Sequence, residues 1–131
     1  NQDVKGFKID LEKATLENTD YRRVLYTAHN SQLVLMSLKP GEEIGEEVHK
    51  LDQFIRIEQG EAKSVLNGVE GILKANDAII IPQDTVHNIM NVGSTDLKLY
   101  TVYTPPEHKD GTVQKTKADE KEEHFDGVTT E

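Results

Sequence analysis

The sequence predicts an all-β fold, an antiparallel sandwich or barrel made by a single domain. Segments of four to seven residues with strand-forming composition recur every eight to twelve residues, separated by Gly, Pro, Asn or Asp. No segment before Pro105 shows the apolar period of 3.6 residues that is typical of a helix. The length of 131 residues suits one domain, and the scarcity of aromatic residues (5%, with no Trp) requires a largely aliphatic core.

In the first half of the chain, the pattern predicts an edge strand followed by longer strands. The edge strand is a short apolar alternation at residues 7–11, and a continuous apolar run at 33–38 predicts a buried strand. Turn residues at 29–31 and the breaker Lys39-Pro40-Gly41 separate these elements. The other expected strands are residues 21–26 and 53–58, the latter reached through 44–48.

The second half begins with the strongest hairpin signal in the chain, Asn67-Gly68, between residues 62–66 and 69–73. After Asn76-Asp77, residues 78–81 predict a short buried strand that Pro82 ends. The last expected strands are residues 87–92 and 97–103.

The composition changes after Pro105-Pro106, which predicts a barrel at residues 1–106 and a charged tail at 107–131. The tail has eight acidic residues against four Lys. A short helix is expected at 118–125, and the rest of the tail is expected to be mobile or to dock on the barrel or a partner subunit.

Charge and composition restrict the partners. The formal charge of −9 repels phosphate groups, so neither a nucleic-acid nor a membrane partner is expected. No apolar run is long enough to span a bilayer and no signal peptide is visible, although the chain begins at Asn1, so a cytoplasmic location is expected. Because the chain has no Cys, any metal must be held by nitrogen and oxygen ligands.

Side chains suited to metal binding fall in two segments next to strands. Glu47 and His49 are two residues apart and share a face if the chain is extended there. Gln53 has the same parity, and His87 starts a strand just after a Pro-containing turn. Each signal alone is weak, because a single His or Glu on a strand is usually structural; their joint arrangement around two turn blocks is the stronger observation.

These two segments resemble the two conserved motifs of the cupin superfamily. The first motif has His-x-His, then Glu, then Gly, and the second has Gly-Asp, Pro, Gly, His and Asn. The matching positions here are Glu47, His49, Gln53 and Gly60 in the first motif, and Asn76, Asp77, Pro82, Asp84, His87 and Asn91 in the second. Asn76 and Asp84 replace glycines, and Asn and Asp tolerate positive φ best among the other residues. The resemblance covers residues 33–104 and implies a double-stranded β-helix, the RmlC-like jelly-roll barrel.

The resemblance also implies a metal shell of Glu47, His49, Gln53 and His87. Glu47 stands for a His of the family and Gln53 for its Glu, so the shell keeps a single negative charge. Asp52 is a rival to Gln53 and a better ligand type, but its parity is wrong for the barrel interior. Such a shell suits a divalent first-row ion, with Mn or Fe favoured and Zn, Ni or Co as alternatives.

For function, the resemblance implies a metalloenzyme that acts on a small oxygenated molecule. One reading is an isomerase similar to the phosphomannose-isomerase-like cupins, although no Lys or Arg phosphate clamp is evident; the other is a dioxygenase. The alternatives are a non-catalytic, metal-dependent protein that binds a sugar or organic anion, and a structural cupin with a vestigial site. Pairing of sheet edges into a homodimer is expected.

The other polar residues are expected to be exposed to solvent or to have structural roles. His29 and His124 are expected in solvent, and Arg56 is expected to point away from the metal. His108 is expected to be structural, with capping of the barrel mouth as the alternative. Asn91 is expected to support the turn of the second motif.

Overall fold

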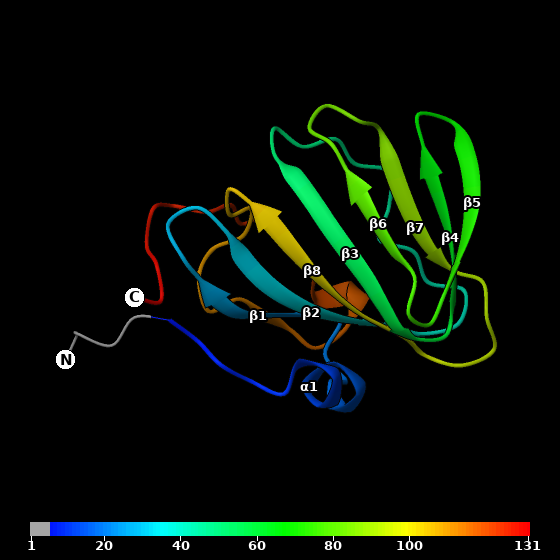
Figure 1. Cartoon of the computed structure of the whole chain (residues 1–131), viewed down its shortest axis with the longest axis horizontal. Coiled ribbons are helices and arrows are strands. Elements are labelled where there is room, and N and C mark those ends of the chain that lie inside the picture. The colour runs from blue at the N-terminus through cyan, green and yellow to red at the C-terminus, as the bar shows by residue number, and fades with distance from the viewer. Residues whose placement is uncertain (1–5) are drawn as a thin grey trace.

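The chain folds into two facing antiparallel sheets, described by a computed structural model over residues 6–131 (Figure 1). The larger sheet has the order β6 (Ala78–Ile81), β3 (Asp52–Gln59), β8 (Leu97–Thr104), β2 (Gln32–Leu38), β1 (Arg22–Thr27) and β9 (Val113–Gln114). The smaller has the order β5 (Val69–Lys74), β4 (Glu61–Leu66) and β7 (His87–Asn91). The predicted all-β fold of antiparallel strands is confirmed.

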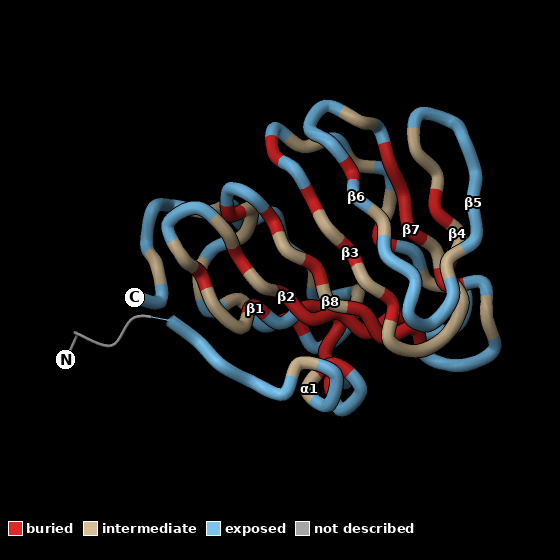
Figure 2. Tube along the Cα trace, in the orientation of Figure 1, coloured by how far each residue is buried: buried red, intermediate tan, exposed pale blue. Residues whose placement is uncertain are grey.

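The core lies between the two sheets and is mainly aliphatic. On β3 every second side chain is buried, so Ile55 and Ile57 face inward while Phe54 and Arg56 are only partly covered. Figure 2 shows the buried stretches along the facing strands, with the loops exposed. The other fully buried aliphatic side chains include Val34, Met36, Leu38, Ile81, Ile89, Leu97 and Leu99.

Among residues 6–131, three non-glycine residues adopt positive φ, and all three lie at predicted turns. Asn67 has φ 48° in the hairpin between β4 and β5, Asn76 has φ 77° before β6, and Asp84 has φ 65° before β7. Asn and Asp adopt this conformation at the lowest cost among residues with a Cβ atom. The replacements at the two glycine positions of the second motif therefore keep its backbone geometry.

The predicted edge strand at residues 7–11 is wrong. Residues 6–10 have no regular structure, and a helix, α1 (Leu11–Glu17), begins where the strand was expected to end. The Asp10 side chain accepts a hydrogen bond from the Lys13 backbone N–H at 3.2 Å, which caps the first turn. Within the described part of the chain, no helix has the length and apolar character needed to cross a membrane.

The short strand at 78–81 forms, but its predicted burial is wrong for three of its four residues. β6 is an outer strand of the larger sheet, and only Ile81 is buried; Ile80 is 66% exposed. An apolar run alone does not distinguish an edge strand from a central one, because the composition of the two can be the same.

The tail docks on the barrel. Its strand β9 pairs with β1, Arg22 opposite Gln114, and a 3₁₀ turn (Lys117–Asp119) follows. The helix expected at 118–125 is reduced to this turn: Asp119 accepts hydrogen bonds from the Thr116 backbone N–H and hydroxyl. Beyond the turn, Glu120 is held by side chains of the barrel rather than by a continuing helix.

Candidate metal centre

Backbone hydrogen bonds bring the two motif segments together. Glu47 N–H donates to His87 O and His87 N–H donates to Glu47 O, each at 2.9 Å. Asp84 N–H donates to His49 O at 2.8 Å, so the turn of the second motif is fixed against the first. The segment before β3 thereby lies along the edge of β7 that does not pair with β4. This contact positions Glu47 and His49.

Three of the four predicted ligands converge. One ligand atom from each of Glu47, His49 and His87 lies within 4.8 Å of the others. The centroids of the two imidazole rings are 5.2 Å apart. These side chains are mostly covered, and His87 is buried. Two imidazoles and one carboxylate at this spacing can ligate a single first-row metal ion.

The Nδ1 side of each imidazole meets an oxygen, which directs Nε2 to the cluster. His87 Nδ1 lies 2.9 Å from Thr85 O, and because a carbonyl only accepts, Nδ1 must be the donor. His49 Nδ1 lies 3.7 Å from the Glu107 carboxylate. His49 Nε2 is 3.6 Å from Glu47 Oε1, too far for a hydrogen bond, and this buried nitrogen has no hydrogen-bond partner among residues 6–131. In metal-ligating histidines the ring nitrogen that does not bind the metal typically faces a carbonyl or carboxylate oxygen, as Nδ1 does in both residues here.

The electrostatics of His49 favour a cation at this position. The Glu47 carboxylate raises the pKa of His49, outweighing burial, which lowers it; Glu107 raises the pKa further and Arg22 opposes this. The Glu47 carboxylate therefore favours the protonated form of the imidazole over the neutral one. A metal ion bound to Nε2 would replace that proton.

Gln53 has the environment expected of a neutral ligand. It is 4% exposed, and its Nε2 donates to Thr101 Oγ1 at 3.1 Å. Its amide oxygen is buried with no hydrogen-bond partner among the described residues, which is costly unless a ligand is bound. Asp52 is exposed, and its carboxylate accepts from Gln83 N–H at 3.0 Å. The choice of Gln53 over Asp52 as fourth ligand stays a prediction.

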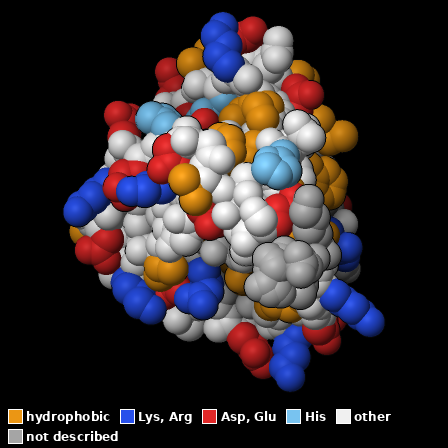
Figure 3. Space-filling model, turned by 90° about the vertical axis from the view of Figure 1, so that its left-hand side faces the viewer, with side chains coloured by type: hydrophobic (Ala, Val, Ile, Leu, Met, Phe, Trp, Pro, Cys, Tyr) orange, Lys and Arg blue, Asp and Glu red, His pale blue; other side chains and the backbone are white. Residues whose placement is uncertain are grey.

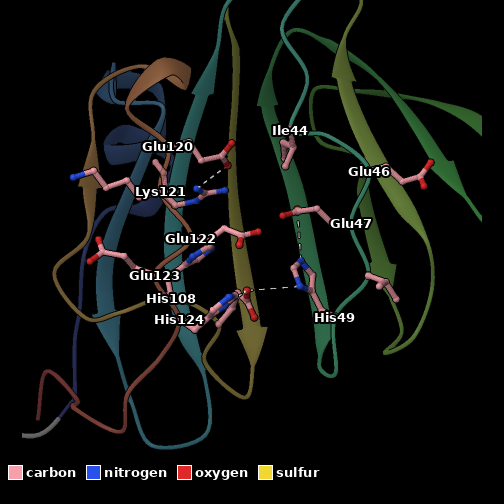
Figure 4. Close-up of a pocket in the computed structure, with 13 residues that line it drawn as sticks. Ile44, Glu46, Glu47, His49, His108, Glu120, Lys121, Glu122, Glu123 and His124 are labelled. Carbon is pink, nitrogen blue, oxygen red and sulfur yellow. Dashed lines mark hydrogen bonds and ion pairs between the residues drawn. The ribbon is translucent and has the colours of Figure 1, made fainter.

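A pocket of about 480 Å³ opens beside the cluster (Figure 4). One side, here called the motif wall, consists of Ile44 and Glu46–His49. The other side, here called the tail wall, consists of Glu107, His108 and residues 120–124. In Figure 4 Glu47 and His49 face His108, Glu120 and Glu122 across the space between them. On the face shown in Figure 3, acidic and basic side chains are interspersed and histidines reach the surface.

A buried arginine also lines the pocket, which the sequence reasoning missed. Arg22 is 2% exposed; its Nη1 donates to Gln114 Oε1 at 2.8 Å and to Glu120 Oε2 at 3.1 Å. Glu120 also accepts from Tyr21 Oη at 3.3 Å and from Lys117 Nζ at 3.1 Å. Burial raises the pKa of Glu120, but Lys117 and Arg22 outweigh it and hold the pKa below its ordinary value. The parity of Arg22 with buried Val24 was the only available signal.

His108 is a neutral part of the tail wall. Its Nε2 lies 3.3 Å from Tyr103 Oη, and the two rings meet edge to face with centroids 5.1 Å apart. Burial, followed by the charges of Arg22, His49 and His124, lowers the pKa of His108 to about 3. Burial also raises the pKa of Tyr103. His108 thus both packs against the barrel and borders the mouth.

The remaining sequence-based expectations can be placed individually. His29 is exposed, and His124 is exposed but contacts the Glu107 carboxylate at 3.2 Å. Arg56 donates to Asn76 Oδ1 at 3.1 Å, and no site-lining group is among its partners. Asn91 supports the turn, as expected: it donates to Leu38 O and Thr95 O and accepts from Gly93 N–H.

Comparison with known proteins agrees with the fold described above. The family described as Cupin domain matches residues 34–103. The uncharacterized protein YrkC of Bacillus subtilis (strain 168) is 44% identical over 123 residues, which cover 88% of this chain and 66% of that protein. The crystal structure of BH2720 from Bacillus halodurans is similar with a TM-score of 0.86 and 38% identity, covering 91% of this chain and 96% of that one. An RmlC-like cupin from Shewanella frigidimarina NCIMB 400 shares the fold, with a TM-score of 0.59 and 24% identity over 64% of this chain and 74% of that one.

Proposed function

The chain belongs to the cupin family, and from this premise we propose that it binds one divalent metal ion through Glu47, His49, Gln53 and His87. The observation that supports this best is the convergence of Glu47, His49 and His87 within 4.8 Å. The buried, unpartnered atoms His49 Nε2 and Gln53 Oε1 add to it, because both are metal-ligand atoms.

The donor set suits a metal ion that is a hard or borderline Lewis acid. It offers one carboxylate, two imidazoles and one amide oxygen, and the chain has no Cys to supply sulfur. Mn or Fe is our first choice, with Zn, Ni or Co as alternatives. The shell keeps one negative charge although Glu47 and Gln53 stand in positions where the family pattern has His and Glu.

We propose an enzyme that acts on a small oxygenated molecule. When bound, the metal would supply Lewis-acid or redox chemistry at substrate oxygens. The chain's own contribution is positional: Thr85 and Glu107 orient the two imidazoles, and the tail wall covers the pocket from the side opposite to the ligands. Sugar isomerisation and dioxygenation are the two reaction types in contention.

A second candidate is non-catalytic binding of a small ligand, and one observation favours it. Two carboxylates of the tail wall are already paired: Glu107 contacts His49 and His124, and Glu120 contacts Arg22 and Lys117. Glu47 is itself a proposed ligand. An isomerase needs a carboxylate that is free to move a proton.

Metal analysis tests the centre directly. Protein purified without added metal is expected to contain close to one equivalent of a divalent ion, and both Glu47→Ala and His87→Ala to lose it. His29→Ala is the matched control, because His29 is exposed and outside the cluster. Unchanged metal content in both site variants would remove the proposal.

Activity assays separate the two reaction types. Oxygen uptake with diketones, flavonols and catechols tests the dioxygenase, and NMR of aldose–ketose mixtures tests the isomerase. If the metal-loaded protein turns over neither group but binds members of one by calorimetry, the non-catalytic candidate is favoured.

A homodimer is also part of the proposal. β5 and β6 are outer strands of the two sheets, and they expose Val69 (72%), Ile72 (53%) and Ile80 (66%). Apolar outer strands are sites at which a second copy can pair. Light scattering is expected to give twice the chain mass; a monomer mass would contradict the dimer. A cytoplasmic location stays a prediction.

A further inference from the structure

The walls of the pocket carry more acidic than basic side chains. Against two cations, Arg22 and Lys121, the lining has six carboxylates. These belong to Glu46, Glu47, Glu107, Glu120, Glu122 and Glu123. A bound divalent ion would add two positive charges at Glu47 and still leave the carboxylates in excess. A pocket lined mainly by one sign of charge attracts ligands of the opposite sign and repels those of the same sign.

The buried cation is not available to an anionic ligand. Arg22 is paired with Glu120 at 3.1 Å, and Glu120 is held in place by Lys117, which also donates to Ile44 O at 2.9 Å. The Glu120 carboxylate occupies the position at which a ligand carboxylate would meet the guanidinium. An anion would have to displace a carboxylate that three side chains already bind.

Three of the carboxylates are not compensated. Glu46, Glu122 and Glu123 are exposed and take part in no ion pair within residues 6–131. Two of the three come from the tail wall, which lies after the residues that match the family. In Figure 4 Glu122 points into the space beside the cluster, whereas Glu46 and Glu123 point away from it. The last two therefore act on a ligand only through long-range electrostatics, which salt reduces.

We infer that the tail wall makes this pocket favour neutral and cationic small molecules over anionic ones. This rests on the proposed function, because it names the ligand class of the same pocket. Phosphorylated sugars and organic acids are thereby disfavoured. Uncharged polyols, phenols and amine-bearing molecules remain.

Three matched ortho-diols test the inference. Dopamine, catechol and 3,4-dihydroxybenzoate share the metal-chelating diol and differ in charge. We expect calorimetry on the metal-loaded protein, under argon to prevent oxidation, to rank dopamine first and the acid last. The span should be about tenfold at low salt and should contract at high salt. Equal or tighter binding of the acid would overturn the inference.

Two variants assign the effect to the tail wall. The double variant Glu122→Gln/Glu123→Gln should reduce the span to about threefold, with metal content unchanged. Glu120→Gln frees the Arg22 guanidinium and should strengthen binding of the acid. Glu17→Gln, an exposed change on α1, is the matched control and should leave the span intact. A span that is unchanged in the double variant would contradict the assignment even if Glu120→Gln failed to fold.

A further set of probes separates this inference from the proposed function. If metal analysis shows no ion, benzylamine, benzyl alcohol and benzoate are titrated into the metal-free protein. The same charge order there supports the inference while the metal proposal fails. If the ion is present and the three diols bind equally, the inference fails and the metal proposal stands.

Discussion

The two walls of the pocket are held by different forces. The motif wall is fixed by backbone: Glu47 and His87 exchange two hydrogen bonds, and His49 O accepts a third from Asp84. The tail wall is fixed mainly by side chains, through Glu120 on Arg22 and Glu107 on His49. The motif wall lies within residues 34–103 that match the family, and the tail wall lies after them.

This difference teaches where each property of the site resides. Backbone hydrogen bonds tolerate substitution of most side chains, so the geometry of the proposed metal ligands depends on the fold itself. Ion pairs depend on individual residues, so the charge and cover of the pocket can change without altering the barrel. Our two proposals, metal binding and selection of the ligand by charge, therefore concern separate segments of the chain.

The largest expected effect is on metal affinity, which should fall much further in a motif-wall variant than in a tail-wall variant. His49→Ala should weaken binding of Mn²⁺ by at least about a hundredfold, because it removes a proposed direct ligand and the loss of an outer-shell partner alone typically costs about 10–100-fold. The double variant Glu122→Ala/Glu123→Ala should weaken binding by no more than about threefold, since neither residue is in the cluster and each acts on the ion only through its charge. Calorimetric titration of metal-free protein measures both. Equal losses in the two variants would erase the distinction.

The next effect concerns stability. Glu120→Ala leaves the buried Arg22 guanidinium without its carboxylate and should lower the free energy of unfolding by about 2–3 kcal/mol, less than for a fully buried pair because Gln114 still accepts from Arg22. Glu122→Ala, on the same wall without an ion pair, should stay within about 0.5 kcal/mol. Urea unfolding gives both values. An unchanged free energy of unfolding in Glu120→Ala would mean that the pairing of Arg22 with Glu120 does not stabilise the fold.

A third prediction uses pH, because the histidines of the two walls have opposite shifts. His108 has a folded pKa of about 3, below its unfolded value near 6.5, so its contribution is complete above about pH 6.5 and is lost as pH falls towards 3. Lowering the pH from about 7 to about 5 should therefore reduce the free energy of unfolding by about 2 kcal/mol through His108. His49 in metal-free protein has a raised pKa, so its contribution is lost as pH rises. His108→Asn should flatten the acid side of the stability profile, and His49→Ala should not.

The smallest expected effect lies where the walls meet. Glu107→Gln keeps the shape of the tail wall but weakens the contact with His49 Nδ1, and metal affinity should fall about tenfold. Glu123→Gln is the control, and stability by urea unfolding should be similar in both. An unchanged affinity would show that Glu107 serves only to hold His124 and the tail.

The fold was largely predictable because its local signals agree with one another. The apolar run at 33–38 predicted a buried strand, which β2 is, and the turns fell at residues that tolerate positive φ, such as Asn76 and Asp84. The failures occurred where two local forces compete. Asp10 caps a helix after an apolar alternation, and β6 has the composition of a buried strand but the position of an outer one.

The site was predictable only on the motif wall. Spacing brought Glu47, His49 and His87 to one place, because residues of equal parity share a face and the family pattern pairs the two segments. The tail wall was not predictable, because Arg22 and Glu120 are 98 positions apart and no local pattern links them. Contacts of this kind depend on the final packing.

That separation in sequence also orders events during synthesis. Arg22 is made before Gln114 and Glu120, which accept from its guanidinium and follow it by 92 and 98 residues. Until then the inner face of β1 carries an unneutralised charge, and β9 is not there to pair with β1. The central strands can associate as they emerge, but this side of the barrel closes only after the tail is translated. Completion of the pocket thus reports that synthesis has passed the tail wall.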